Sequence, residues 1–197
     1  MPPKVRVTKD MILDKAFAMT RENGFESVTA RGLAEELACS TQPIFRVYEN
    51  MESLRVDLYA RSLEFFAKNM CDVISKSTQE IKKTDKRDPV FLGMGMTYLE
   101  LAKRETYLFR LLCAGVETDE VRVGSIYDFA ETQTEYTLFE DLPGMGKVPQ
   151  EKKRELFLME WIFTHGLAAM TANNGVELSE TEQRELLVKA YHAMEQA

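Results

Sequence analysis

Apolar residues recur at spacings of three and four along nearly the whole chain. The first example follows Thr8, where Ile12, Leu13, Ala16 and Phe17 fall on one face of a helix. No stretch alternates β-branched apolar residues with polar ones between turn residues, which is the pattern of a half-buried strand. The sequence therefore predicts an all-α protein.

Glycine, proline and asparagine residues divide this pattern into helices. The Asn23-Gly24 pair ends the first helix, because glycine accepts the left-handed conformation that follows a C-cap. The polar stretch 76–89 predicts a helix end and a loop, and the two prolines and two glycines of 141–149 predict another loop. We expect helices over residues 8–23, 29–37, 41–47, 52–75 (with Leu54, Leu58 and Leu63 inward), 90–103, 106–114, 120–139, 150–172 and 179–195.

The charge of the chain is unevenly distributed. Residues 1–50 carry seven cations and seven anions, so the net charge of −7 falls entirely on residues 51–197. An acidic surface repels phosphate, and only the N-terminal part suits a polyanionic partner. We therefore expect two domains, residues 1–51 and residues 52–197.

The sequence also bears on the cellular compartment. No apolar run approaches the ~20 residues that a membrane span needs, and the first residues, MPPKVRVTKD, lack the apolar core of a secretory signal. Cys39, Cys71 and Cys113 are widely spaced and fit neither a disulfide framework nor a metal-binding CxxC pattern. We expect a cytoplasmic protein with no membrane partner, no metal and no cofactor.

Two short helices joined by a tight turn stand out in the N-terminal part. They cover residues 29–37 and 41–47, with Thr29 and Ser40 as predicted N-caps. In a DNA-binding helix-turn-helix, the start of the second helix enters the major groove. Thr41, Gln42 and Arg46 have side chains that can read base edges there. The same two-helix pattern is also common in helical proteins that bind no DNA.

Residues 12–54 resemble the N-terminal domain of the TetR family of bacterial transcriptional regulators. The resemblance rests on element order and on the Asn23-Gly24-Phe25 stop, on Thr29 opening a helix, on Leu33-Ala34, and on the Phe45–Tyr48 aromatic pair before Leu54. It implies a homodimer that binds a palindromic operator in double-stranded DNA and dimerises through its last two helices, about residues 150–195. It also implies a small-molecule effector, with repression as the usual mode.

The resemblance places candidate DNA contacts residue by residue. Phe45, Val47 and Met51 replace the Tyr, His and Lys that usually contact phosphate in the family, so we expect weaker or differently anchored DNA binding. A basic N-terminal arm could compensate in the minor groove, although such arms often have no role. The candidate DNA-binding residues are Lys4, Arg6, Lys9, Thr29, Arg31, Ser40, Thr41, Gln42, Arg46 and Tyr48. The alternative is a small-molecule-binding or adaptor protein that keeps the fold without binding DNA.

The C-terminal part is rich in methionine and aromatic residues. Most such residues belong to cores, but in the TetR family the middle helices surround a ligand cavity, and walls of this kind suit a small apolar or aromatic effector. The candidate ligand-binding residues are Phe66, Met70, Tyr98, Phe109, Cys113, Tyr127, Trp161 and His165. Apolar faces on 150–172 and 179–195, the first with small residues at Gly166, Ala168 and Ala169, are the predicted dimer surface.

Catalytic motifs are missing from the sequence. The two histidines, His165 and His192, belong to no HExxH or paired ExxH motif, and no glycine-rich phosphate loop follows a strand. No histidine lies near a cysteine in sequence to activate it. We expect a binding protein rather than an enzyme.

Overall fold

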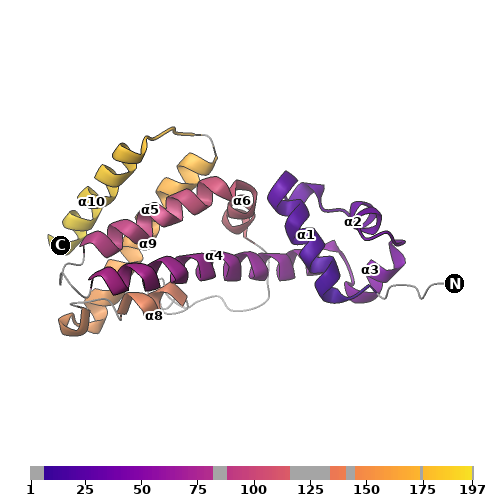
Figure 1. Cartoon of the computed structure of the whole chain (residues 1–197), viewed down its shortest axis with the longest axis horizontal. Coiled ribbons are helices and arrows are strands. Elements are labelled where there is room, and N and C mark those ends of the chain that lie inside the picture. Colours follow the sequence, from indigo (N-terminus) through magenta and orange to yellow (C-terminus); the bar gives the residue numbers. More distant parts are fainter. Residues whose placement is uncertain (1–6, 82–87, 116–133, 141–144, 174, 197) are drawn as a thin grey trace. The chain divides into compact units, whose positions relative to one another are not determined.

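The structure of the chain, a computed structural model, describes residues 7–81, 88–115, 134–140, 145–173 and 175–196. All regular structure in these ranges is helical, which confirms the predicted all-α class (Figure 1). Its elements are α1 (Lys9–Asn23), η1 (Phe25–Ser27), α2 (Ala30–Glu36), α3 (Gln42–Val47), α4 (Met51–Ile81), α5 (Asp88–Arg104), α6 (Thr106–Ala114), α8 (Thr134–Glu140), η2 (Met145–Lys147), α9 (Gln150–Ala172) and α10 (Glu180–Gln196). No helix within the described ranges combines the length and apolarity needed to cross a membrane.

The chain folds into two compact units. The first consists of Met1–Glu64 and Glu105–Asp119, and the second of Phe65–Arg104 and Glu120–Ala197. The first unit thus adds the N-terminal half of α4 and all of α6 to residues 1–51, the segment that the sequence predicts as a domain. Helix α4 contributes residues to both units.

The first unit is a helix-turn-helix domain with its own core. Ile12 and Ala16 of α1, Leu33 of α2, Ile44 of α3 and Leu54 of α4 are fully buried and belong to one apolar cluster. Helix α1 ends at Gly24 as predicted, and Thr8 caps its start. The Thr8 hydroxyl accepts a hydrogen bond from the Met11 N–H at 3.3 Å, and Gly24 has a φ of 83°.

The turn between α2 and α3 differs from the prediction at one of its two caps. Thr29 caps α2, because its hydroxyl accepts a hydrogen bond from the Gly32 N–H at 3.0 Å. The predicted Ser40 cap is wrong: Thr41 precedes α3 in a helical conformation, and no side chain caps this helix. Ala38 has a positive φ of 48°, and the Cys39 N–H donates to the Ala34 carbonyl at 2.9 Å. The turn therefore includes a backbone conformation that glycine usually adopts.

Helix α6 is held against α1 inside the first unit. Arg21 makes a two-pronged ion pair with Glu105, with Nε to Oε2 at 2.7 Å and the second nitrogen to Oε1 at 2.5 Å. Glu105 is only 5% exposed. A Cβ at Gly24 would lie 3.2 Å from the Tyr107 ring, so glycine also permits this close approach.

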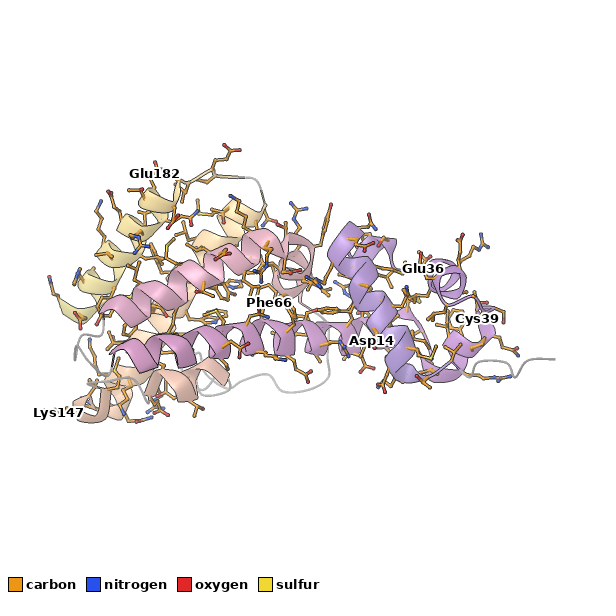
Figure 2. The ribbon with its side chains drawn as sticks, viewed as in Figure 1. Asp14, Glu36, Cys39, Phe66, Lys147 and Glu182 are labelled. Carbon is orange, nitrogen blue, oxygen red and sulfur yellow. The ribbon has the colours of Figure 1, made fainter. Side chains whose placement is uncertain are left out.

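The second unit packs α5, α9 and α10 against one another, with α8 and η2 at one end of α9. Phe91, Phe139, Phe157 and Tyr191 belong to its aromatic core, and Phe66 points into the interior from α4 (Figure 2). A Cβ at Gly95 would lie 2.9 Å from the Leu187 side chain, which is why α5 and α10 can approach closely here.

Local signals account for the start of α10. The Glu182 carboxylate accepts from the Ser179 N–H at 2.8 Å, and the Ser179 hydroxyl accepts from the Glu182 N–H at 3.2 Å. This reciprocal arrangement is a capping box. Hydrogen bonding to Ser179 also holds the pKa of Glu182 below its usual value.

Three expectations about the long segments need correction. Helix α4 continues to Ile81 rather than ending near residue 75, because its polar end still has good helix formers. Leu63, expected inward, is 44% exposed. Within the predicted loop 141–149, Met145 is fully buried in a short 3-10 helix. Most of the expected helix 120–139 lies outside the described residues, which include its end as α8.

Candidate functional sites in the two units

The helix-turn-helix presents a polar surface around α3. Six of the candidate DNA-binding residues are exposed on α2, the turn and α3: Thr29, Arg31, Ser40, Thr41, Gln42 and Arg46. Neither Arg31 nor Arg46 pairs with a carboxylate within the described part of the chain. Both guanidinium groups can therefore meet an external anion.

The remaining DNA-binding candidates are placed differently. Tyr48 is 4% exposed with its hydroxyl buried, so it cannot contact DNA, and its inclusion among these candidates is corrected. Burial and a neighbouring Asp57 raise the pKa of Tyr48 well above its usual value. Lys9 is exposed but pairs with Asp57 at 2.6 Å. Lys4 and Arg6 lie outside the described residues.

Phe45, Val47 and Met51, where the resemblance led us to expect weaker phosphate contacts, also differ in exposure. Phe45 is 49% exposed on α3, whereas Val47 and Met51 pack against the unit's core. None of these side chains can donate a hydrogen bond to phosphate. Phe45 retains one possible use at a DNA surface, since an aromatic ring can contact a thymine methyl group.

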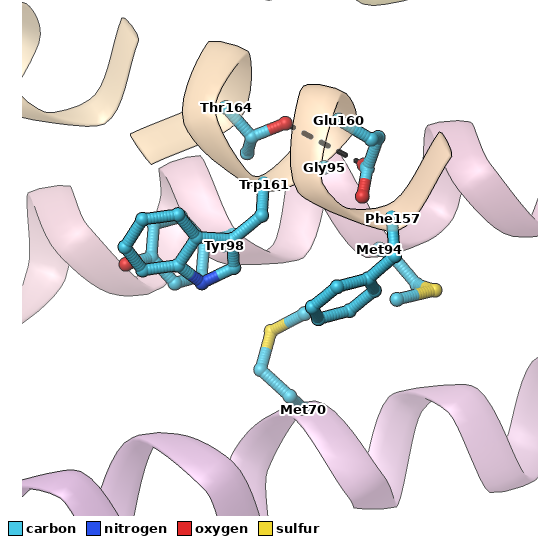
Figure 3. Close-up of a pocket in the computed structure, with 8 residues that line it drawn as sticks. All are labelled: Met70, Met94, Gly95, Tyr98, Phe157, Glu160, Trp161 and Thr164. Atoms are coloured by element: carbon cyan, nitrogen blue, oxygen red, sulfur yellow. Dashed lines mark hydrogen bonds between the residues drawn. The ribbon is translucent and has the colours of Figure 1, made fainter. Parts of the chain in front are cut away.

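The second unit contains a small apolar pocket between α4, α5 and α9 (Figure 3). Met70 lines it from α4, Tyr98 from α5 and Trp161 from α9. Its volume is about 30 Å³, room for one or two water molecules. Its lining residues are Met70, Met94, Gly95, Tyr98, Phe157, Glu160, Trp161 and Thr164.

A larger cavity of about 230 Å³ lies between α5, α9 and α10. Its walls include Phe91 and Tyr191, whose rings lie 4.4 Å apart between centroids, together with Leu187 and His192. An engineered cavity of ~150 Å³ binds benzene in another protein, so this volume suits a one- or two-ring molecule. Glu160 and Thr164 line both the pocket and this cavity.

Glu160 is the acidic residue common to both spaces. The residue is only partly buried as a whole, yet its carboxyl is enclosed by neighbouring helices, and this burial raises its pKa from 4.5 to about 7. Its hydrogen-bond partner is the Thr164 hydroxyl, which donates to Oε1 at 3.5 Å (Figure 3). Within the described ranges no cation pairs with it.

An aromatic group of three side chains adjoins the pocket. The Trp161 and His165 rings stack 4.8 Å apart with a 7° angle between their planes. The Tyr98 hydroxyl lies 2.8 Å from His165 Nδ1. Burial lowers the pKa of His165, so near neutral pH the ring is neutral and can share one hydrogen bond with Tyr98.

The candidate ligand-binding residues come together only in part. Met70, Tyr98 and Trp161 line the pocket. Phe66 and His165 do not line it, but their rings contact the Tyr98 ring. Phe109 and Cys113 belong to the first unit and line neither of these two spaces, and Phe109 is a fully buried core residue. Tyr127 lies outside the described residues.

Sequence reasoning missed Glu160, the residue that brings a carboxyl group to the pocket. A signal was present, because Glu160 shares a four-residue spacing with the buried residues Leu156, Thr164 and Ala168. A carboxylate on such a helix face is expected to be enclosed. Met94, Gly95 and Phe157 carried no signal that would separate pocket lining from ordinary core.

An apolar strip runs along the outer side of α9. Ile162 is 48% exposed and Met170 is 53% exposed, one turn on either side of Gly166. A Cβ at Gly166 would meet no atom within 4 Å, so this glycine opens onto free space. Part of the apolar face predicted on 150–172 is thus left uncovered by the described residues.

Comparisons with known proteins agree with the helical architecture. The chain is similar to a solved structure of a protein of unknown function from Rhodococcus sp. RHA1, with a TM-score of 0.64 and 14% sequence identity. The match covers 100% of this chain and 98% of that chain, and at such low identity it shows the fold alone. No protein-family model and no curated protein matches the sequence. Within the described residues, no three His, Cys, Asp or Glu side chains are grouped to hold a metal ion.

Proposed function

We propose that the chain is a ligand-responsive transcriptional regulator of the TetR type, which binds a palindromic operator as a homodimer. The observation that carries the proposal is the polar surface of α3, the second helix of the helix-turn-helix. Thr41, directly before this helix, and Gln42 and Arg46 on it are exposed. The resemblance of residues 12–54 to the family supports it. Repression is the mode that this resemblance favours.

The cavities of the second unit support the ligand-responsive part. They lie among α4, α5, α9 and α10, where walls of aromatic residues and methionine suit a small apolar or aromatic molecule. A ligand changes DNA binding only through its different affinities for the DNA-competent and incompetent forms. Helix α4 is the natural connection, because its residues belong to both units.

The DNA-binding proposal is tested by selecting genomic fragments on the purified protein at low salt. We expect one or a few palindromic sites, and Gln42→Ala should weaken binding to them by about 1–3 kcal/mol if Gln42 reads a base. Gln196→Ala, at an exposed glutamine of α10, is the control and should bind as the wild type does. Absence of any enriched fragment contradicts DNA binding, and equal binding by Gln42→Ala contradicts only the role of this residue.

The homodimer is tested at the uncovered strip of α9. Replacing the exposed Ile162 by Glu should convert the dimer to a monomer in sedimentation experiments, because it places a charge in an apolar interface. Ala18→Glu introduces the same charge at an exposed position of α1 and should leave the dimer intact. A wild-type protein that sediments as a monomer contradicts this part of the proposal.

One observation favours a second candidate, a small-molecule-binding protein that keeps the fold without binding DNA. Phe45, Val47 and Met51 supply no phosphate contact, and phosphate contacts contribute much of DNA affinity. The same selection experiment decides between the two. Loss of all fragments together with retained ligand binding in the second unit would favour this candidate.

A further inference from the structure

The Glu160 carboxyl is an ionisable group in the walls of two mainly apolar spaces. It lines both the 30 Å³ pocket and the 230 Å³ cavity, and within the described residues its hydrogen-bond partner is the Thr164 hydroxyl at 3.5 Å. The other titratable groups that line the two spaces are Tyr98 on α5 and Tyr191 and His192 on α10. None of these is a permanent cation that could neutralise a carboxylate.

An unpaired carboxyl at this position costs stability. Burying a carboxylate without a cation is unfavourable, and a glutamine or leucine would fill the same volume at lower cost. The long bond to Thr164 does not require a charge, since an amide oxygen could accept it equally well. The remaining acceptor sites of the carboxyl are available to a molecule in the cavity.

The surroundings of Glu160 suit one class of partner. Tyr98, Phe157 and Trp161 present aromatic rings to the pocket, and aromatic faces attract cations as well as apolar groups (Figure 3). An organic anion would be repelled by the carboxylate. A neutral hydrocarbon would leave the carboxyl unpaired.

We propose that the second unit binds a small aromatic or aliphatic amine, whose protonated nitrogen pairs with Glu160 while its apolar part fills the adjoining cavity. This inference rests on the proposed function only for the consequence of binding, namely release or capture of DNA. The cavity volume limits the apolar part to about one or two rings. The pairing stabilises the ionised form of Glu160, so amine binding releases a proton wherever the free carboxyl is protonated.

The test uses three probes of similar shape: 2-phenylethylamine, 2-phenylethanol and 3-phenylpropionate. Binding is followed through the fluorescence of Trp161, which is the single tryptophan of the chain and lines the pocket. We expect the amine to bind on the order of tenfold more tightly than the alcohol, and the propionate to bind more weakly than both. Affinity for the amine should rise between about pH 6 and about pH 8, because Glu160 ionises there while an alkylamine stays protonated.

Two variants and a control show whether the preference comes from Glu160. Glu160→Gln should remove the preference for amine over alcohol, whereas Glu160→Asp should retain it in reduced form. Glu151→Gln removes a carboxylate from an exposed position at the start of the same helix and should leave the preference unchanged. Circular dichroism establishes that each variant is folded.

Several results would overturn the inference. They are equal binding of amine and alcohol by the wild type, tighter binding of the propionate, a preference retained in Glu160→Gln, or no fluorescence response to the amine at millimolar concentration. The proposed function fails separately. If the amine binds as expected but no DNA fragment is ever selected, the amine site stands and the regulatory role does not.

Discussion

Replacing Glu160 by Gln should stabilise the protein at alkaline pH and change its stability little at acidic pH. The carboxyl has an ordinary pKa of 4.5 and a pKa of about 7 in the folded chain, raised because burial disfavours the charged form. Between these two values the folded protein holds a proton that the unfolded chain has lost. The contribution of Glu160 to stability is therefore present at low pH and is lost as the pH rises through about 7.

The size of the effect follows from the two pKa values. A rise from 4.5 to about 7 corresponds to roughly 3 kcal/mol of unfavourable free energy for the charged form, at about 1.4 kcal/mol per pKa unit. Partial exposure of the residue lowers this figure, so about 2 kcal/mol is a fair expectation. Glutamine has nearly the same shape and can still accept the Thr164 hydrogen bond.

The measurement is urea unfolding of wild type and Glu160→Gln at about pH 4 and about pH 8, at one fixed protein concentration. We expect the variant to gain about 2 kcal/mol over the wild type at the higher pH and less than about 0.5 kcal/mol at the lower. Glu151→Gln, at an exposed position, should change stability equally at both pH values. A Glu160→Gln variant that loses stability at pH 8 would refute the reasoning, because it would mean that the folded state favours the charged carboxylate.

Two further predictions concern the first unit. Ala38→Gly should raise the free energy of unfolding by about 1 kcal/mol, because Ala38 is exposed at a φ of 48°, which glycine adopts without strain. The control Ala193→Gly, in the regular helix α10, should lower the free energy of unfolding by a similar amount. Urea unfolding that shows both variants changing stability in the same direction would contradict the argument. Arg21→Met should cost about 2 kcal/mol and more than Glu105→Gln, because it takes a cation away from a buried carboxylate, whereas the partly exposed arginine can turn to solvent. Thermal unfolding of both variants measures the difference, and an equal cost would show that the pair contributes little.

The sequence predicts best what depends on neighbouring residues in the chain. Helices α6 and α9 have their predicted bounds, and Gly24 and Thr29 act at helix ends as expected, because caps and stops are local signals. The Ser40 cap failed for a local reason as well, since Thr41 is already in a helical conformation. Polarity was a poor guide to the end of α4, where residues with good helix propensity continue the helix to Ile81.

The candidate pocket could be predicted only where bulk or aromatic character marked the residue. Met70, Tyr98 and Trp161 were found in this way, but the same reasoning selected Phe109, which packs in the other unit because α6 is joined to α1 by the Arg21–Glu105 pair. Tyr48 failed similarly, because periodicity does not show that its hydroxyl turns toward Asp57 and into the core. These assignments depend on contacts between residues far apart in sequence.

Charge connects the proposed site with the composition of the chain. The net charge of −7 on residues 51–197 would oppose entry of an anionic effector and would attract a cation, since the field of the whole surface acts on an approaching ligand. The acidity that argues against DNA binding by this part of the chain therefore agrees with an amine site at Glu160. Attraction by surface charges weakens with added salt, whereas pairing with an enclosed carboxylate is screened much less. Raising the salt concentration should therefore slow association of 2-phenylethylamine more than it lowers the preference for the amine over the alcohol.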